Sequence, residues 1–425
     1  MTTPQPQFLN EEKSLACVHC GLCLGACPTY LETGNENESP RGRIYIMRAL
    51  QAGRLPLDSA SVQHIDLCLG CRACEVACPS GVQYGALLEE TRDFIEEHHA
   101  RSAYQSFLRR FVIERIFPVP WRMKLALVPA ALAKTLRLDK LLPAGLREPL
   151  SLVPTRMSPD KTPEFSPATV QPAKGRVGFI RGCVMSVMFG DTNAASVRLL
   201  NELGFDVVSP REQVCCGALF AHSGRMKLAR EHAARNIAVF AKEKLDAIII
   251  NAAGCGSTLK EYGNLLESDP TLKKPAFEFA HKVRDITEFL TDHAFAKRQF
   301  RPSTDRVTYH DACHLAHPQR ITKQPRELVR AVAGPNYVEL PEADVCCGSA
   351  GTYNLTEPEM AERLQQRKIQ NILSTGATTV VTSNPGCIMQ IRSGLEKAAP
   401  TKIRVLHIAD FLLEASRGQN AQLKV

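Results

Sequence analysis

Three regularities in the sequence predict a mixed α+β and α/β protein, with a mainly helical N-terminal domain followed by a duplicated α/β unit. One cysteine spacing occurs twice before residue 80. The remaining cysteines form two sets of four whose equivalent members lie 130 to 132 residues apart, which indicates an internal duplication. Within each copy, short β-branched runs alternate with helical patterns, as in parallel sheets covered by helices.

Length and composition limit the classes of protein to consider. At 425 residues and 44% hydrophobic content, the chain is long enough to bury two or three cores. It has 16 cysteines, and its N-terminus lacks the basic start and apolar run of a secretory signal. In a reducing compartment such cysteines bind metal or carry out redox chemistry more often than they form disulfides, so we expect a cytoplasmic protein.

The first two cysteine runs read CVHCGLCLGACP, from Cys17 to Pro28, and CLGCRACEVACP, from Cys68 to Pro79. This spacing is similar to that of bacterial ferredoxins, in which three close cysteines bind one [4Fe–4S] cluster and the fourth binds the other. The similarity implies one cluster bound by Cys17, Cys20, Cys23 and Cys78 and a second bound by Cys27, Cys68, Cys71 and Cys74. The proline after each run lacks an N–H and has a fixed φ, so it can turn the chain away from the cluster.

Structural zinc is the alternative for these runs, because paired C-x₂-C motifs also suit a tetrahedral zinc ion. Zinc needs neither eight ligands in two identical runs nor a proline after each run, so we favour clusters. We expect Gly21, Gly25 and Gly70 to permit tight loops, and His19 and His64 to be packing or surface residues rather than ligands.

Three arginines, Arg41, Arg43 and Arg48, follow the first run. A cluster bound by four thiolates is negatively charged, so a cation beside it would raise its reduction potential. Surface ion pairs at the start of a helix are the competing interpretation.

The duplicated region predicts matching strands and helices in its two copies. RVGFI and RVTYH precede the first cysteine of each copy, and DAIIINAAGC and TTVVTSNPGC lead to the last one. Helices are expected over 224–245 and 357–376, the second ended by Gly376, and again over 285–294 and 407–416. This alternation places cysteines at the carboxyl edges of small parallel sheets, where such folds bind ligands.

Each copy contains an isolated cysteine, a Cys-Cys-Gly sequence and a final cysteine. The candidate ligands are Cys183, Cys215, Cys216 and Cys255 in the first copy and Cys313, Cys346, Cys347 and Cys387 in the second. Adjacent cysteine side chains normally diverge, which favours a cluster over a disulfide within the pair; a redox or structural thiol role without metal stays open. Around Cys313 we expect hydrogen bonding to a cluster thiolate, rather than direct ligation, from His310, Asp311, His314 and His317.

A basic segment and a proline-rich stretch connect the two regions. Residues 101–150 contain ten Lys and Arg residues against three acidic ones, interleaved with apolar residues and Trp121. This pattern predicts an amphipathic helix that contacts a membrane surface or a partner, with a solvated connector as the alternative. Residues 154–172 predict an extended linker, and no apolar run is long enough to span a bilayer. The predicted domains are 1–100, 101–172, 173–300 and 301–425.

The order of these parts resembles a known family along essentially the whole chain. The Cys-Cys-Gly units resemble the cysteine-rich domains of heterodisulfide reductases, which have a further cysteine where this chain has Thr258 and Gln390. That departure argues against a five-cysteine cluster and against disulfide-reducing catalysis. The ensemble resembles the iron–sulfur subunit of bacterial glycolate oxidase, or glycolate dehydrogenase, on the sequences CVHCGLC, SPRGRIYIM, CLGCRACEVACPSGVQY, NAAGCGSTLKEYG and CCGSAGTYN.

The resemblance implies an electron-transfer subunit of an oxidoreductase, with no catalytic residues of its own. No Gly-rich dinucleotide motif, P-loop or Ser-His-Asp sequence is present, which agrees with substrate oxidation on a partner. FAD-binding subunits would oxidise glycolate to glyoxylate, and the two [4Fe–4S] clusters, with any further clusters in the duplicated units, would pass electrons towards a membrane quinone. The implied location is the cytoplasmic face of the inner membrane, with no nucleic acid partner. The alternatives are an iron–sulfur subunit of a D-lactate or glycerol-3-phosphate dehydrogenase and a catalytic subunit of the heterodisulfide reductase type.

Overall fold

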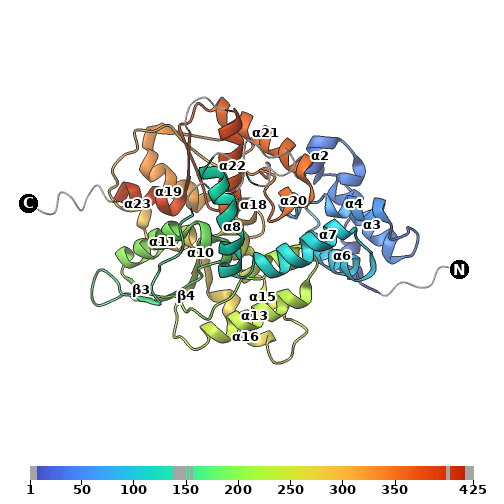
Figure 1. Ribbon diagram of the computed structural model, residues 1–425, viewed down its shortest axis with the longest axis horizontal. Helices are drawn as coiled ribbons and strands as arrows, with labels where there is room; N and C mark the ends of the chain where they lie inside the picture. The colour runs from blue at the N-terminus through green and yellow to red at the C-terminus, as the bar shows by residue number, and fades with distance from the viewer. Residues whose placement is uncertain (1–6, 137–149, 151–152, 154–156, 399–402, 417–425) are drawn as a thin grey trace, which may run out of the picture.

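Two sheets of matching topology form the larger part of the molecule, and a group of short helices lies at one end (Figure 1). The computed structural model describes residues 7–136, 150, 153, 157–398 and 403–416. We call residues 173–300 copy 1 and residues 301–425 copy 2. The copies lie side by side, copy 1 green to yellow and copy 2 orange to red, and the blue N-terminal helices pack beside them. The predicted fold class is confirmed.

The N-terminal domain consists of short helices joined by the cysteine-containing loops. Its elements are α1 (Glu11–Leu15), η1 (Leu24–Ala26), α2 (Pro28–Thr33), η2 (Glu36–Glu38), α3 (Pro40–Gln51), α4 (Ser59–Asp66), α5 (Ala73–Val76) and α6 (Tyr84–His98). Ser39 and Asp58 cap α3 and α4, because their side-chain oxygens accept hydrogen bonds from the N–H groups of Gly42 and Ser61. The apolar faces of α3, α4 and α6 meet in a small core.

Two helical segments joined at a sharp bend follow this domain, where the sequence predicted an amphipathic helix. α7 (Ala103–Phe107) continues into the π-helix η3 (Leu108–Ile116), and α8 (Pro120–Thr135) comes next. The bend of 118° falls where Pro118 and Pro120 interrupt the backbone hydrogen bonds. Among the described residues no single helix is long and apolar enough to cross a membrane, and this bent pair passes that test only by length and composition. Part of the predicted basic segment, 137–149, lies outside the described residues.

Copy 1 and the end of the preceding linker form a five-stranded sheet in the order β1-β3-β2-β4-β5, parallel except for the β1–β3 pair. Its strands are β1 (Phe165–Ser166), β2 (Gly175–Phe179), β3 (Phe205–Val208), β4 (Ala247–Ile250) and β5 (Val283–Asp285). Its helices are α10 (Cys183–Met188), α11 (Gly190–Leu203), α12 (Ala218–His222), α13 (Met226–Phe240), α14 (Ala253–Lys260), α15 (Tyr262–Leu265), α16 (Lys273–Lys282), α17 (Ile286–Asp292) and η5 (Phe295–Lys297).

Copy 2 contains a parallel four-stranded sheet in the order β7-β6-β8-β9. Its strands are β6 (Val307–Tyr309), β7 (Tyr337–Val338), β8 (Thr379–Thr382) and β9 (Arg404–His407). Its helices are α18 (Cys313–Ala316), α19 (Lys323–Ala333), η6 (Gly334–Asn336), α20 (Tyr353–Thr356), α21 (Pro358–Ser374), α22 (Pro385–Ala398) and α23 (Ile408–Ser416). Gly376, two residues after α21, adopts the left-handed conformation expected of a residue that ends a helix.

The register of the two sheets shows the duplication residue by residue. Val177 of β2 pairs with Ala247 of β4, and Val307 of β6 pairs with Thr379 of β8. The offsets between equivalent partners are 130 and 132 residues, as for the cysteines. The duplication predicted from cysteine spacing is therefore a duplication of the whole sheet unit.

The two copies share one core. α11 packs against α23 and α17 packs against α19, and these pairs are equivalent under the duplication. Side chains from β2, β4, β6 and β8 join the same buried cluster. Polar contacts also cross this interface: Thr192 donates to Asp410 at 2.7 Å, and His407 Nε2 donates to the carbonyl of Asn251 at 2.7 Å. The cysteine-bearing edges of both sheets are thus held in a fixed relation.

The described part of the linker is extended and packs against copy 1. Phe165 and Ser166 form β1, which pairs antiparallel with β3. Gly190 N–H at the start of α11 donates to the carbonyl of Ser158 at 2.6 Å. The linker therefore adds an edge strand to the sheet of copy 1. β1 lies within residues 101–172, the predicted connector, and the predicted domain limits stay a prediction.

We predict that Gly190→Ala lowers the free energy of unfolding by about 1–3 kcal/mol, the usual cost of overpacking. A Cβ at this position would lie 2.4 Å from the carbonyl carbon of Pro159, so the linker or α11 has to move. Thermal unfolding followed by circular dichroism measures the change. Asp191→Ala, at an exposed position in the same helical turn, is the control, and equal effects of the two substitutions would contradict this explanation.

Candidate metal centres

Four predicted ligands of the N-terminal domain lie together in its interior: Cys27, Cys68, Cys71 and Cys74 line one cavity of about 20 Å³ and are all buried. Cys27 comes from the first run and the other three from the second, which is the crossed arrangement that the ferredoxin spacing implies. Burial raises the pKa of the Cys74 thiol, and Cys71 raises it further. Buried thiolates this close together repel one another, so the site suits a positively charged metal group that compensates the thiolate charge.

The other four predicted ligands lie nearer the surface. Cys20 is exposed, and Cys17, Cys23 and Cys78 are partly buried against the same helical core. Burial raises the pKa of the Cys23 thiol. The structure thus separates an interior set of four cysteines from a surface set, and the assignment of each set to one cluster remains a proposal.

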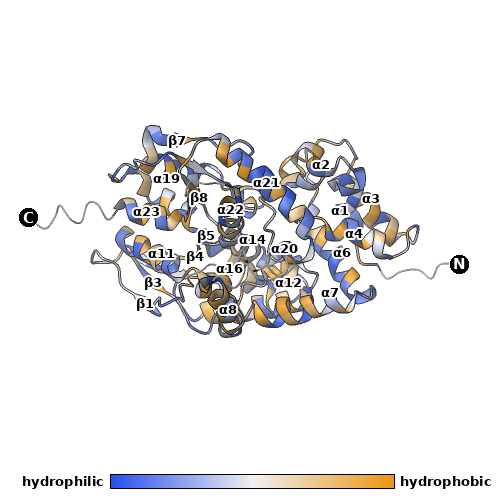
Figure 2. Cartoon of the chain, turned by 45° about the horizontal axis from the view of Figure 1, so that its top comes forward, coloured by the Kyte–Doolittle hydropathy of each residue, from blue (hydrophilic) through white to orange (hydrophobic). Residues whose placement is uncertain are grey.

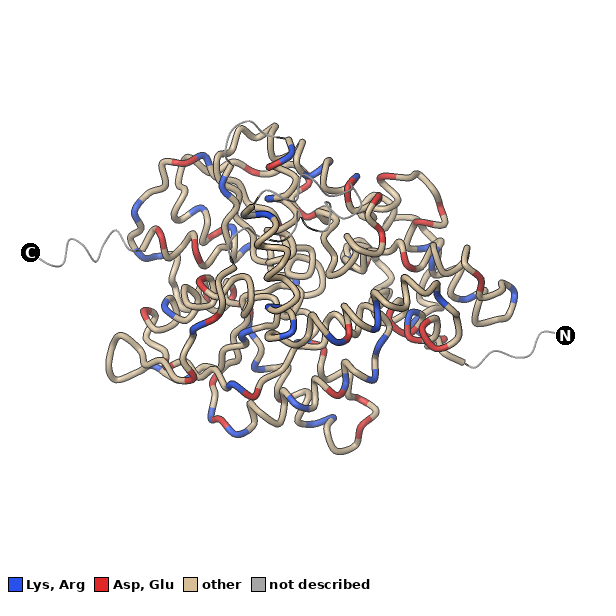
Figure 3. Tube along the Cα trace, in the orientation of Figure 1, with Lys and Arg blue, Asp and Glu red and all other residues tan. Residues whose placement is uncertain are grey.

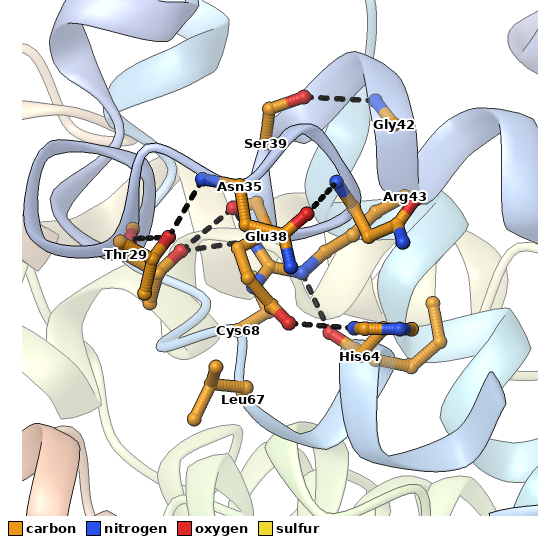
Figure 4. A network of polar contacts seen from close by, with 12 residues as sticks. Thr29, Asn35, Glu38, Ser39, Gly42, Arg43, His64, Leu67 and Cys68 are labelled. Carbon is orange, nitrogen blue, oxygen red and sulfur yellow. Dashed lines mark hydrogen bonds and ion pairs between the residues drawn. The ribbon is translucent and has the colours of Figure 1, made fainter. Parts of the chain in front are cut away.

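Arg43, on α3, is fully buried beside the interior set (Figure 4). Its guanidinium donates to the carboxylate of Glu38 and to the carbonyl of His64, both at 2.7 Å, and Glu38 also lies 2.6 Å from His64 Nδ1. Burial by itself would lower the pKa of Arg43, but its neighbours, Cys68 first, raise it above the ordinary value. A permanent cation therefore lies where a thiolate-bound cluster would carry negative charge.

The other two arginines differ from Arg43. Arg41 forms an ion pair with Glu36 at 2.7 Å and donates to the carbonyl of His19 at 3.0 Å. Arg48 is partly exposed. The sequence left two interpretations open, a cation beside a cluster and a surface ion pair. Arg43 is the buried cation, and Arg41 forms the surface ion pair.

The cysteines of copy 2 meet at the carboxyl ends of β6 and β8, where α18 and α22 begin, and line a cavity of about 100 Å³. The Sγ atoms of Cys313 and Cys346 are 3.9 Å apart. The pKa of Cys387 is lowered to about 5, because the Cys347 thiol lies beside it and His310 is close. A low pKa favours the thiolate, which is the form that binds iron.

The equivalent cysteines of copy 1 line a larger cavity, of about 230 Å³, whose walls are mainly apolar. The Sγ atoms of Cys183 and Cys215 are 3.7 Å apart. The Cys215 thiol raises the pKa of Cys183, and burial raises it further. Met123 and Leu127 of α8 also line this cavity. The two copies therefore share four cysteine positions but differ in their electrostatic surroundings.

The loop that carries the second cysteine run packs directly on copy 2. The carbonyl of Gly70 accepts a hydrogen bond from His314 Nε2 at 3.0 Å, across 244 residues of sequence. Cys71 and Cys346 belong to one buried cluster of side chains. Burial raises the pKa of Cys71, and the nearby Cys346 raises it further. The interior set of the N-terminal domain and the cysteines of copy 2 are thus neighbours.

Two histidines lie between the cavities of the two copies. His222 and His314 line both cavities, and their rings meet edge to face with centroids 4.9 Å apart. Burial lowers the pKa of His314 to about 4, with His222 contributing, so His314 is neutral at pH 7. The cysteine cavities of copies 1 and 2 therefore adjoin across a pair of imidazole rings.

Three residues predicted to contact a cluster thiolate have other partners. His314 bonds to Gly70 as described, and His317 Nε2 donates to the carbonyl of Asp344 at 3.1 Å. Asp311 forms an ion pair with Arg326 at 2.6 Å. These contacts use one ring nitrogen of each histidine and the carboxylate of Asp311, and the hydrogen bonds to a cluster thiolate stay a prediction.

Arg92 is a residue near these sites that the sequence patterns did not single out. From α6 its guanidinium donates to the carbonyl of Cys68 at 2.6 Å and to that of His222 at 2.8 Å. It therefore joins the second cysteine loop to copy 1. No local signal identifies such a residue, because its partners are backbone atoms distant in sequence.

Family models and curated relatives agree with this architecture. A model described as a 4Fe-4S dicluster domain matches residues 13–82, and one described as a cysteine-rich domain matches residues 177–260 and 307–392. The chain is 40% identical to a probable glycolate oxidase iron–sulfur subunit of Bacillus subtilis (strain 168), over 96% of this chain and 95% of that protein. It belongs to the family of glycolate oxidase iron–sulfur subunits.

Two further relatives define the breadth of the family. Identity is 32% with the glycolate oxidase iron–sulfur subunit of Escherichia coli (strain K12), over 92% of this chain and 91% of that protein. It is 30% with lactate utilization protein A of Oceanobacillus iheyensis, over 56% of this chain and 96% of that protein. The resemblance stated from the sequence is confirmed, and the chain is an iron–sulfur subunit of the glycolate oxidase or lactate utilisation type.

The dicluster and cysteine-rich domains also confirm iron–sulfur clusters as the cofactors expected from the sequence. The structure fits this cofactor, because each predicted group of buried thiols faces a cavity and Arg43 supplies a compensating positive charge. Bound clusters accept and release single electrons, with potentials that depend on charge and burial.

We predict that Arg43→Gln lowers the reduction potential of one cluster by roughly 50–100 mV, the equivalent of about 1–2 kcal/mol of lost attraction. Arg43→Lys keeps the charge, so it should largely preserve the potential while weakening the contacts with Glu38. Redox titration of the anaerobic protein, monitored by EPR, measures both. Arg48→Gln, on the same helix, is the control, and unchanged potentials in Arg43→Gln would refute the role assigned to this cation.

Proposed function

We propose that this chain carries electrons from a flavoprotein that oxidises glycolate to a membrane quinone. Glycolate oxidation to glyoxylate releases two electrons and two protons, and quinone takes up two of each to become quinol. Because a cluster transfers one electron at a time, several clusters in sequence can connect these two-electron reactions. The observation that carries the proposal is the contact between the interior cysteine set and copy 2, since it joins the ferredoxin-like domain to the duplicated unit.

Electrons would enter at the surface cysteine set. Cys20 is exposed, and exposed apolar side chains surround the same loops, namely those of Leu15, Val18, Leu22 and Val76. Clustered apolar residues on a protein surface favour a protein partner. An FAD-binding subunit docked at this surface would bring its flavin close to the first cluster.

From there the cysteine groups form a continuous series. The interior set adjoins copy 2 through Cys71 and Cys346, and the cavity of copy 2 adjoins that of copy 1 at His222 and His314. Electrons would therefore pass from the N-terminal domain to copy 2 and then to copy 1.

The cavity of copy 1 supports a quinone as the final acceptor. Its walls are mainly apolar and include Met185 and Met188 of α10 beside Met123 and Leu127 of α8. Adaptable apolar walls of this kind suit a flat lipophilic ring. The same α8 presents apolar side chains outwards, so the cavity lies beneath the surface that we assign to the membrane.

The α7–α8 region supports peripheral association with the cytoplasmic face of the inner membrane. Apolar side chains are exposed along it at helical spacing, at Tyr104, Phe107, Phe111, Trp121, Leu125, Val128 and Leu132. Figure 2 shows that hydrophobic residues recur along the ribbon at α7. Exposed basic residues accompany them, at Arg110, Arg115, Arg122 and Lys124. Figure 3 shows the Lys and Arg positions along the chain in blue. Arg101 and Arg109 are not available for lipids, because they pair internally with Asp66 and Glu96. An apolar stripe flanked by basic residues is typical of binding to anionic lipid.

A related dehydrogenase partner is the alternative that a specific finding favours, because the chain also resembles a lactate utilization protein. An electron-transfer subunit for D-lactate or glycerol 3-phosphate would use the same cysteine path. A disulfide-reducing role has less support, since the positions of the fifth cysteines hold Thr258 and Gln390, and both are buried.

We expect the complex of this chain with its flavoprotein subunits to reduce quinone with glycolate as the electron donor. Without this chain, the flavoprotein subunits should still reduce an artificial dye with glycolate, but quinone reduction should fall at least a hundredfold. Spectrophotometric assays with glycolate, D-lactate and glycerol 3-phosphate measure both reactions. A clear preference for one of the other two substrates would assign the chain to that dehydrogenase, and quinone reduction independent of this chain would refute the relay.

We expect the double substitution Trp121→Ser with Leu125→Ser to weaken binding to vesicles that contain anionic lipid by about tenfold or more, since each side chain contributes about 1.5–3 kcal/mol when buried. Flotation at two salt concentrations measures binding and its electrostatic part. Leu373→Ser, at an exposed position on α21, is the control. Equal binding of all three proteins would place the membrane contact elsewhere.

A further inference from the structure

His310 occupies an unusual position at the end of β6. Its side chain is fully buried, and neither ring nitrogen has a partner at hydrogen-bond geometry in the described part of the chain, although the Cys387 thiol lies beside the ring. A ring nitrogen of His310 and the Sγ atoms of Cys347 and Cys387 all lie within 4.8 Å of one another. Leaving a buried polar group unpaired costs about 1–3 kcal/mol, so an imidazole without a role would be disfavoured here.

The fold does not require an imidazole at this position, as copy 1 shows. Ile180 is the equivalent residue, 130 positions earlier, and it is also buried. Ile180 N–H donates to the carbonyl of Ile249, and His310 N–H donates to that of Val381, both at 2.9 Å. The backbone is thus the same in both copies, and the side chain alone differs. An isoleucine fills this position in copy 1, so packing alone does not require the histidine in copy 2. A chemical role for the imidazole explains it better.

The surroundings of His310 match those of a metal ligand. Nitrogen and sulfur ligands bind a metal at about 2.0–2.3 Å, so ligand atoms that share one metal lie less than about 4.6 Å apart, close to the separation found here. Metal-binding histidines use the neutral ring, which has a lone pair free for the metal.

We propose that a ring nitrogen of His310 binds iron in the cluster of copy 2, beside Cys313, Cys346, Cys347 and Cys387, and that copy 1 binds its cluster through cysteines alone. This goes beyond the hydrogen bond to a thiolate that the sequence suggested. It rests on the proposal that the duplicated units hold clusters, but not on the identity of the oxidised substrate.

Because the imidazole is neutral, His310 would add a ligand to the four thiolates without adding negative charge. A cysteine at the same position would add one negative charge and so lower the reduction potential of the cluster. A neutral fifth ligand therefore keeps the copy 2 cluster easier to reduce than five thiolates would.

The test uses the full chain, purified without oxygen and labelled with ¹⁵N-histidine. Pulsed EPR of the wild type should show a directly bound histidine nitrogen, and chemical analysis should give about twelve to sixteen irons per chain. His310→Ile reproduces the residue of copy 1, so it should fold, keep its iron, lose the nitrogen coupling and change one reduction potential. His317→Gln, in the same loop, is the matched control and should keep the coupling.

Three results would overturn the proposal: no histidine nitrogen coupling in the wild type, coupling that persists in His310→Ile, or zinc in place of iron in copy 2. About eight irons per chain would also overturn it, because copy 2 would then hold no cluster. If His310→Ile fails to fold, His310→Cys supplies a thiolate instead. This variant should lack the nitrogen coupling and keep the iron, and coupling that remained in it would exclude His310 as the ligand. Glycolate turnover is not part of this readout, so failure of the substrate assignment is distinguishable from failure here.

Discussion

The packing of the second cysteine loop on copy 2 is the contact on which the rest of the structure depends. Electron carriers work together only when they lie close, and this loop brings the interior cysteines next to those of copy 2. Hydrogen bonds from His314 and from the hydroxyl of Tyr353 fix its backbone at Gly70 and Leu67. Arg92 anchors the same loop from α6. Ion pairs add to this junction, because Arg72 of the loop pairs with Glu261 of copy 1 and Glu32 of α2 pairs with Arg363 and Arg367 of copy 2.

Duplication supplied two equivalent positions for cysteines, and divergence of the surrounding residues gave them different properties. Copy 2 faces the ferredoxin-like domain, and two of its four cysteines, Cys346 and Cys387, have a lowered pKa while Cys313 and Cys347 have a raised one. Copy 1 faces α8 and has apolar walls around thiols of raised pKa. The single change from Ile180 to His310 belongs to this divergence. The two cavities therefore differ, since that of copy 2 lies beside the ferredoxin-like domain and includes polar groups, whereas that of copy 1 lies beside α8 and is mainly apolar.

Local patterns in the sequence were enough to predict the fold class, because cysteine spacing and strand–helix alternation are properties of neighbouring residues. They also predicted the offset between the copies, which the strand register repeats at Val177 and Val307. They could not distinguish Arg43 from Arg41, because which arginine is buried depends on how α3 packs. The roles of Arg92 and His314 were equally inaccessible, since their partners lie 24 and 244 residues away. The extended linker was recognisable, but its pairing as β1 depends on the edge of a sheet that only the fold creates.

The long separation between the second cysteine loop and its docking surface also has a consequence for biosynthesis. The two are 244 residues apart at the Gly70–His314 contact. At about 5–20 residues per second, the ribosome needs roughly 12–50 seconds to make the intervening chain. During that interval Leu69, Cys71 and Ala73, which the finished protein buries against copy 2, have nothing to cover them. A nascent chain in this state presents an apolar, thiol-rich surface to the cell, which makes chaperones and the iron–sulfur delivery machinery natural early partners.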